Sequence, residues 1–502
     1  MSDAFENRLH ALRDGEIEIE HGINEYIGHA DVLRLLLEVA PDEIRDDLSF
    51  LHTLMVDTRD AVGGAVLGVF PRLQDPELAN VEGRISDFVA ERHGLRLGDG
   101  RYEAGKLVGE SRCPAWPGAG SPLTNNRFPY LLDTSASNYF SNRFWHGDGG
   151  PAGFIAVPTG GRVVLRGEYP RARYFAFHPS DFDTNTLATL VDVDIDPDPG
   201  SVNPYREAAP AAAPRRYSVQ LVFTPAPADP EPNTSYVGCK RSGEPNPAVF
   251  NIYRTTGSDL GAFPPNSAGV LLPSVTVYDS DGEQVAHHDE AEPYPPGTEP
   301  PVETTTFASL PIPDYRGLVR PGKWDTLSNW GLPCDLLASA DILYVGTPYS
   351  SRWGELLVVR AKAFATPHTP EEPPYAEGKD TRAFTVTNYN FWAGVANTSL
   401  IDHDIARDDD GWLTLVVSTA ENRPANATAA EGVTWFDWGP YLDGQITFRF
   451  LIRREPLLVD LREAIDTGTA SSRVAPYVPR AGHTSKAEFE ARGWRAALPE
   501  AG

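Results

Sequence analysis

Residues 160–205 constrain the fold more than any other part of this chain. They contain two runs rich in β-forming residues, Arg162–Gly167 and Ala172–His178. In the first run Val163 and Leu165 alternate with their neighbours at the period of two that is typical of a half-buried strand. Because later segments repeat this pattern, we expect the middle of the protein to be antiparallel β-sheet.

Similar patterns continue from about residue 136 to about residue 455, separated by turns and proline-rich loops. The dipeptides Asp281-Gly282 and Asp410-Gly411 are typical of hairpin turns. Helices and strands do not alternate regularly, so we expect no parallel α/β sheet. The predicted strands are Phe154–Val157, Arg162–Gly167, Ala172–His178, Arg216–Thr224, Val249–Thr255, Ser274–Tyr278, Gln284–His287, Leu343–Tyr344, Leu356–Phe364, Ala383–Tyr389, Leu413–Ser418 and Gln445–Leu451.

The N-terminal part is predicted to be helical instead. Apolar residues recur there at helical spacing, and Pro41 opens one helix with Asp42 and Glu43 in its first turn. Negative charge in the first turn suits the helix dipole, and proline suits the first helical position. We expect residues 1–97 to form a helical bundle, followed by a Gly/Pro-rich connector at 98–135.

The rest of the chain divides into two related β units and a tail. The strand patterns predict antiparallel β-sandwich-like units at 136–330 and 331–456. Residues 457–502 are predicted to be a helical tail, in which Ser485 and Glu488 have the spacing of a capping box. The expected fold class is therefore mainly β with an α-helical N-terminal domain.

Two segments each contain a further recognisable pattern. The first comprises GGRVVLRGEYPRARYFAFHPSDF (160–182) and DIDPDPGSVNPY (194–205), in which a strand ending in Gly precedes Pro-x-x-Arg-Tyr-Phe and Pro-Asp-Pro-Gly. The second, residues 404–453, contains an Asp-x-Asp-Gly hairpin, a Trp-containing loop and a strand ending in Arg. These segments resemble the opening and closing parts of an uncharacterised bacterial β-sandwich family with an N-terminal helical module. The resemblance implies architecture and brings no activity with it.

The net charge of −27 limits the partners of the protein. A surface this negative repels nucleic acid and anionic lipid, so neither nucleic acid nor a membrane is expected as a partner. No stretch approaches the roughly 18 apolar residues of a membrane helix, and the acidic N-terminus is unlike a signal peptide. We expect a soluble bacterial protein, cytoplasmic unless a leader has been removed, that binds a small molecule and is free to form a homo-oligomer.

Common catalytic motifs are absent from the sequence. It has no P-loop, no nucleophile elbow, no His-Glu-x-x-His motif and no Rossmann glycine pattern. Its three cysteines, Cys113, Cys239 and Cys334, are far apart, which disfavours a disulfide framework or a Cys-rich zinc site. The identity of any cofactor stays open.

Histidines lie beside carboxylates in three places. His146 precedes Asp148 by two residues, His287 and His288 precede two acidic residues, and His403 lies between two aspartates. A neutral imidazole beside a carboxylate suits a transition metal or acid–base chemistry, although all three clusters also suit polar loops. Adjacent residues of a strand point to opposite faces, so His287 and His288 cannot both enter one site.

Aspartates and tryptophans form two further groups. Proline occupies the position at which an EF-hand loop needs glycine, so the aspartates favour a solvated acidic edge over a calcium site. The tryptophans suit either sandwich cores or an aromatic-lined cleft for an apolar or sugar-like ligand. The aspartates are Asp192, Asp194, Asp196 and Asp198, and the tryptophans are Trp392, Trp412, Trp435 and Trp438.

The loop at 145–150 is the best candidate for a site. Its Trp145, His146 and Asp148 lie beside glycines that would let the backbone approach a ligand. Tyr174 and His178 are four residues apart on a predicted strand, so they share a face. We expect His146, Asp148 and His178 to be the catalytic groups of one pocket and Trp145 and Tyr174 to bind the ligand, without a metal.

Two classes of function remain open. The first is a soluble protein that holds a small organic or carbohydrate-like ligand in an aromatic-lined β-sandwich cleft. The second is an enzyme, such as a lyase, isomerase, cyclase or hydrolase, that uses a histidine–carboxylate pair without a covalent nucleophile.

Overall fold

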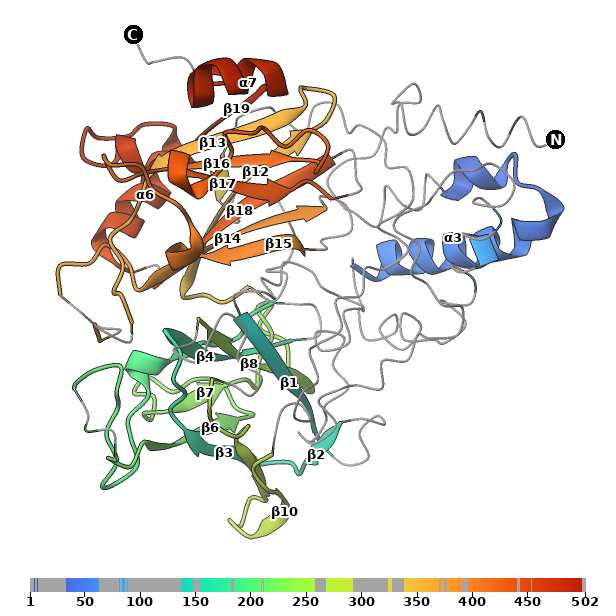
Figure 1. Ribbon diagram of the computed structural model, residues 1–502. Helices are drawn as coiled ribbons and strands as arrows, with labels where there is room; N and C mark the ends of the chain where they lie inside the picture. Colours follow the sequence, from blue (N-terminus) through green and yellow to red (C-terminus); the bar gives the residue numbers. More distant parts are fainter. Residues whose placement is uncertain are drawn as a thin grey trace.

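The computed structural model describes two β-sandwiches in sequence and part of a helical N-terminal region (Figure 1). The described residues are 33–62, 137–147, 154–181, 185–208, 210, 212–257, 268–291, 324–326, 338–369, 372–373, 377–390, 396–439, 443–452 and 454–498, with Ala4, Asn7, Val81, Arg84, Ile85 and Phe88.

The first sandwich packs two five-stranded sheets against each other. The β1 sheet has the order β2 (Ile155–Val157), β1 (Ser137–His146), β8 (Ala248–Thr256), β4 (Tyr174–Ser180) and β5 (Leu190–Val191). The β3 sheet has the order β10 (Gln284–His288), β9 (Ser274–Tyr278), β3 (Arg162–Glu168), β6 (Arg216–Val222) and β7 (Thr234–Tyr236).

The second sandwich has the same plan. The β12 sheet has the order β11 (Asp325–Thr326), β12 (Ile342–Ser350), β18 (Asp443–Leu451), β14 (Ala383–Asn390) and β15 (Ala396–Ile401). The β13 sheet has the order β17 (Val433–Asp437), β16 (Trp412–Ser418), β13 (Leu356–Lys362) and β19 (Arg480–Thr484).

The order β1-β8-β4-β5 of the first sandwich returns as β12-β18-β14-β15 in the second. The order β9-β3-β6-β7 likewise returns as β19-β13-β16-β17, and the β6–β7 and β16–β17 pairs are both parallel. The two units are therefore related copies of one topology, as the sequence pattern predicted. This correspondence makes it possible to compare equivalent positions.

Alternation along the strands builds the two cores. In β6 every second residue is buried, and Tyr217, Val219 and Leu221 face the core of the first sandwich. In β13 the residues Leu357 and Val359 face the core of the second. Since one face of each strand is apolar, two sheets must pack face to face to bury it.

The second sandwich extends beyond the expected range of 331–456. Its strand β11 precedes residue 331, and β19 comes from the segment expected to be a helical tail. That segment also contains α6 (Pro456–Thr467) and α7 (Lys486–Arg492). Strand β19 pairs with β13. This is a long-range contact, and no local pattern in the tail predicted it.

Two helices agree with the local signals in the sequence. Helix α3 (Asp42–Val62) begins after Pro41, as predicted. The side chain of Ser485 accepts a hydrogen bond from the backbone N–H of Glu488 at 3.2 Å, which caps α7. The expected connector at 98–135 and most of the expected bundle at 1–97 lie outside the described residues.

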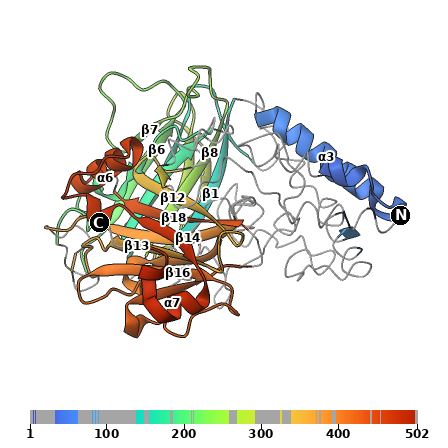
Figure 2. The same cartoon turned by 90° about the horizontal axis from the view of Figure 1, so that it is seen from above.

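A layer of side chains joins the two sandwiches. Tyr174 and Ala176 of β4 pack with Tyr344 of β12 and Leu451 of β18 in one buried apolar cluster. The outer face of the β1 sheet therefore meets the outer face of the β12 sheet (Figure 1). Seen from above, α6 and α7 both lie on the second sandwich (Figure 2). No helix among the described residues is long and apolar enough to cross a membrane.

Candidate functional site

His146 lies at the end of β1 and faces the core of the first sandwich. Its ring stacks on that of Phe223, with 4.9 Å between the centroids, and burial lowers the pKa of His146. Trp145 is half-buried and meets Phe154 edge to face. Asp148, the expected carboxylate partner, lies outside the described residues.

His178 lies on the opposite face of the same sheet. Both Ser141 of β1 and His178 of β4 are register partners of Ile252 in β8, so these three residues share a face. His146 follows Ser141 by an odd number of residues along β1 and therefore points to the other face. The expected pocket shared by His146 and His178 is wrong, because the sheet itself separates the two rings.

Tyr174 and His178 do share a face, as their spacing predicted, but both are buried. Their exposed fractions are 0 and 2%, and neither ring nitrogen of His178 has a hydrogen-bond partner among the described residues. Burial, and then the nearby Arg254, lower the pKa of His178 to about 3. This imidazole is therefore neutral and shielded from solvent, which is unsuitable for proton transfer with a ligand that enters from solvent.

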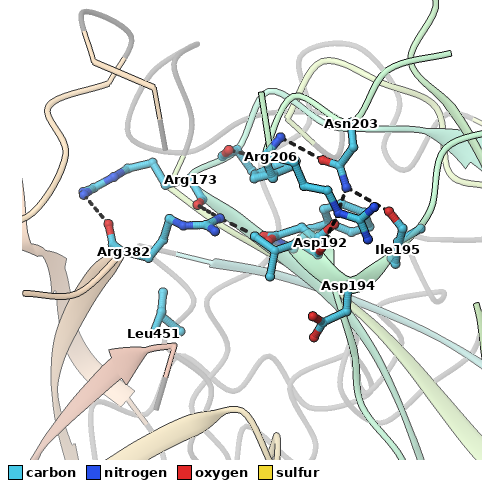
Figure 3. A network of polar contacts seen from close by, with 12 residues as sticks. Arg173, Asp192, Asp194, Ile195, Asn203, Arg206, Arg382 and Leu451 are labelled. Carbon is cyan, nitrogen blue, oxygen red and sulfur yellow. Dashed lines mark hydrogen bonds and ion pairs between the residues drawn. The ribbon is translucent and has the colours of Figure 1, made fainter. Parts of the chain in front are cut away.

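Two of the aspartates expected to form a solvated edge, Asp192 and Asp194, bond to arginines of the second sandwich at the joint between the sandwiches (Figure 3). Asp192 is fully buried in the 3₁₀ helix η2 (Asp192–Asp194), where it accepts hydrogen bonds from the Phe175 backbone and from Arg382. Asp194 pairs with Arg454 at 2.9 Å, and Asp196 pairs with Arg206. The solvated-edge interpretation is wrong for Asp192, which neutralises a buried arginine.

A second pair repeats this contact with the sandwiches exchanged. Arg173 precedes β4 and binds Asp402 of the 3₁₀ helix η5 (Asp402–Asp404), whereas Arg382 precedes β14 and binds Asp192. The pairs are thus reciprocal between equivalent positions. A comparison of the chain with itself would have revealed them, since Arg-x-Phe and a later Asp-x-Asp-Ile occur in both units. The network is structural, and it holds the two sandwiches together.

The outer face of the β3 sheet carries a different constellation. Arg162 and Arg166 lie on the same face of β3, with their neighbours Val163 and Leu165 in the core. The Arg162 guanidinium lies over the Tyr278 ring, 4.9 Å from its centroid. Arg166 donates to the Tyr278 hydroxyl at 3.3 Å. Both arginines are only half-buried, and they converge on one tyrosine.

Further polar side chains continue this face across the sheet. Thr276 receives a hydrogen bond from Arg166 at 3.4 Å and shares another with Nδ1 of His287 at 2.9 Å. On the opposite side, Gln220 donates to Thr234 at 2.8 Å. We call these six residues the β3 face, namely Arg162, Arg166, Gln220, Thr276, Tyr278 and His287.

The acidic residues around the β3 face are engaged with other groups. Glu168 lies 3.8 Å from Arg215, and Glu290 pairs with Arg216. Asp289 accepts from His287 at 3.2 Å, and Glu231 accepts from Gln220 at 3.1 Å. Within the described part of the chain, neither Arg162 nor Arg166 forms a salt bridge.

The equivalent face of the second sandwich is used structurally. Arg360, the counterpart of Arg166, forms a salt bridge with Asp408 at 2.8 Å, and its guanidinium lies 4.3 Å from the Trp494 ring centroid. Phe489 of α7 packs there against the apolar residues Leu356 and Val358 of β13. In the first sandwich the chain after β9 turns back and adds β10 at the sheet edge, and the residues described there include no counterpart of α7.

The remaining predicted clusters form no metal centre. No group of three His, Cys, Asp or Glu residues able to hold a metal ion occurs among the described residues. His287 and His288 pair with adjacent β9 residues and face opposite sides, as expected. Nε2 of His403 lies 3.1 Å from the Pro367 carbonyl oxygen, and Asp402 is committed to Arg173.

The tryptophans do not gather in one cleft. Trp438 is buried in the core of the second sandwich against Tyr349, whereas Trp412 and Trp435 lie half-buried on the outer face of the β13 sheet. Trp392 lies outside the described residues.

Comparison with known proteins gives no function. No family model and no curated protein matches the chain. An uncharacterised protein from Burkholderia cenocepacia aligns with 71% of this chain and 84% of its own, at 15% identity and a TM-score of 0.37. The VPA0106 protein from Vibrio parahaemolyticus aligns with 72% of this chain and 92% of its own, at 11% identity and a TM-score of 0.31. Both TM-scores are below 0.5, so neither alignment assigns a fold or a function to this chain.

Proposed function

We propose that this protein is a non-catalytic binding protein that holds a small organic or carbohydrate-like ligand on the β3 face. The observation that supports this function is the contrast between equivalent faces of the two sandwiches. The second sandwich covers its face with α7 and pairs Arg360 with Asp408, whereas every residue of the β3 face except the buried Thr276 is at least partly exposed among the described residues. The same topology can therefore bury this face, and we interpret the uncovered polar side chains of the first sandwich as a binding surface.

The chemistry of the face suits a hydroxyl-rich ligand. Arg162 and Arg166 supply only donors, Gln220 supplies both donors and acceptors, and His287 is more than a third exposed at the sheet edge. These groups sit on paired strands, so their positions are fixed before the ligand arrives, which reduces the entropy cost of binding. The ligand would rest on a platform and not in the aromatic-lined cleft expected from the sequence.

The enzyme alternative receives less support. It requires an imidazole and a carboxylate beside a common substrate, at about 3 Å from the reacting atoms. His146 and His178 are on opposite faces of the β1 sheet, and His178 is buried and neutral. A binding function requires no such pair.

Native mass spectrometry and isothermal titration with a panel of neutral and acidic oligosaccharides test the proposal. We expect the variants Gln220→Ala and His287→Ala each to weaken the binding of a panel member about 5- to 10-fold, because each removes a hydrogen bond worth about 1 kcal/mol. The matched control is Glu463→Ala, an exposed residue on α6 of the second sandwich, which should leave binding unchanged.

Two results would contradict the function. Equal affinity of the β3-face variants and the wild type would place the ligand elsewhere. Conversion of the bound saccharide into a product, detected by mass spectrometry after incubation, would make the protein an enzyme.

A further inference from the structure

We propose that the ligand of the β3 face carries a carboxylate or sulfate group, and that Arg162 and Arg166 bind this group beside Tyr278. The proposal rests on the proposed function and names the class of ligand, an acidic saccharide. The proposed function does not specify the charge of the ligand, and this inference does.

The two guanidinium groups lie close together. Arg162 is 4.9 Å from the centroid of the Tyr278 ring, and Arg166 is 3.3 Å from the hydroxyl oxygen of that ring. Two positive charges that contact the same side chain near a protein surface repel each other. An anion placed between them removes this repulsion and is attracted by both.

The described residues of this face offer no internal anion to do this. The surrounding carboxylates of Glu168, Glu231, Asp289 and Glu290 each contact another residue in an ion pair or a hydrogen bond, and neither arginine has a salt bridge among the described residues. Other arginines of the described residues, such as Arg171 and Arg407, also lack a salt bridge. What distinguishes Arg162 and Arg166 is that both contact one tyrosine, Tyr278, while neither pairs with a described carboxylate.

The second sandwich shows that the fold does not require this feature. Its Arg360 occupies the position of Arg166 and binds Asp408 at 2.8 Å. Asp198, the counterpart of Asp408, forms no bond with Arg166, and Leu356 replaces Arg162. Compared with the second sandwich, the first therefore has an additional arginine, Arg162, on this face, and its Asp198 is not paired with the arginine as Asp408 is.

Arginine is suited to recognise an oxyanion. Its planar guanidinium can donate two parallel hydrogen bonds to a carboxylate or sulfate, and such charge-assisted bonds are about twice as strong as neutral ones. The net charge of −27 repels anions over most of the surface, so the attraction must be local. The remaining side chains, Gln220 and His287, would bond the hydroxyl groups of the sugar.

Isothermal titration with three probes tests the inference. The probes are an oligogalacturonate, its fully methyl-esterified and therefore neutral form, and a sulfated oligosaccharide. We expect at least one of the charged probes to bind ten or more times more tightly than the neutral ester. The affinity should fall as salt is added, because partly exposed charges are screened. The stronger of the two charged probes identifies the anionic group.

The variants Arg162→Gln and Arg166→Gln locate the effect. Each should weaken binding of the charged probe about tenfold while changing binding of the neutral ester less than twofold. Arg407→Gln, an exposed arginine of the second sandwich, is the matched control and should change neither. Thermal denaturation shows that each variant is folded before it is titrated.

The outcomes separate the two proposals. Equal binding of the ester and the acids, with sensitivity to Gln220→Ala, would overturn the anionic ligand and keep the binding face. Binding of the charged probe that is unaffected by both arginine variants would also overturn it. Failure of the wild type to bind any saccharide would overturn both proposals.

Discussion

Arg173 and Asp402 are 229 residues apart in the sequence and form an ion pair that is almost completely buried between the two sandwiches. Nη2 of Arg173 lies 3.1 Å from Oδ2 of Asp402 and also donates to the carbonyl oxygens of Pro367 and Arg382. Arg382 and Asp192 form the reciprocal pair. Removing one charge of either pair would leave the other buried without its partner, which is costly.

Loss of Asp402 should destabilise the protein strongly. We expect Asp402→Ala to lower the free energy of unfolding by about 3–5 kcal/mol, because Arg173 would be left charged and buried. Asp194→Ala is the control, since the side chains of the Arg454–Asp194 pair are 53 and 44% exposed and such pairs contribute less than about 1 kcal/mol. Urea denaturation measures both changes. Equal losses would show that burial does not decide the contribution of these pairs.

Asp341 should make the joint less stable at alkaline pH. It is 8% exposed, and burial raises its pKa from 3.8 to about 7. Between these values the unfolded carboxyl group ionises while the folded one keeps its proton, so stability is lost as the pH rises and the loss is complete above about 7.

The variant Asp341→Asn isolates this carboxyl group. It should be more stable than the wild type at pH 8, by up to about 4 kcal/mol, and close to it at pH 4. The charged groups that act on Asp341, namely Asp192, Asp194, Arg382 and Arg454, remain in both proteins. Denaturation curves at both pH values give the difference, and a gap independent of pH would contradict the prediction.

His178 should have the opposite pH dependence. Its pKa falls from 6.5 to about 3 on folding, mainly through burial. The unfolded state binds the proton first, so stability is lost as the pH falls from about 6.5 toward 3. In His178→Gln this component disappears, and the slope of stability against pH below 6.5 should be shallower than in the wild type. Parallel slopes in the two proteins would mean that the ring is accessible to protons.

Gly482 should be sensitive to even one added methyl group. A Cβ atom on Gly482 would clash with the carbonyl oxygen of Ala497, which follows the 3₁₀ helix η8 (Gly493–Ala496) above the sheet. We expect Gly482→Ala to cost about 1–3 kcal/mol and to disturb Trp494 against Arg360, which tryptophan fluorescence would detect.

Gly243→Ala is the control for this substitution. An added Cβ atom at Gly243 would have no non-neighbouring atom of the described residues within 4 Å. Because φ is +87°, we expect only backbone strain of about 1 kcal/mol. If both variants unfold at the same temperature and Gly482→Ala has an unchanged fluorescence spectrum, η8 does not pack as closely as described.

Local sequence signals predicted the local structure correctly at several positions. Alternation in Arg162–Gly167 predicted β3, the dipeptide Asp281-Gly282 predicted the hairpin between β9 and β10, and Ser485 with Glu488 predicted the start of α7. These signals depend on neighbours within a few residues, and such interactions are present before the chain is folded. The relation between the two units was visible for the same reason, because equivalent strands carry similar patterns.

Contacts between residues far apart in the sequence could not be predicted in this way. His146 and His178 belong to strands that share β8, and the register of these pairings placed the two rings on opposite faces. The sequence around Asp192 suggested a solvated side chain. Its burial depends instead on a contact with Arg382, which is 190 residues away. Arg162 and Arg166 were equally unremarkable until β9 brought Tyr278 beside them. Strand pairing and sheet packing are contacts between residues far apart in the sequence. Spacing along one strand shows which side chains share a face, but it does not show which residues of other strands they contact.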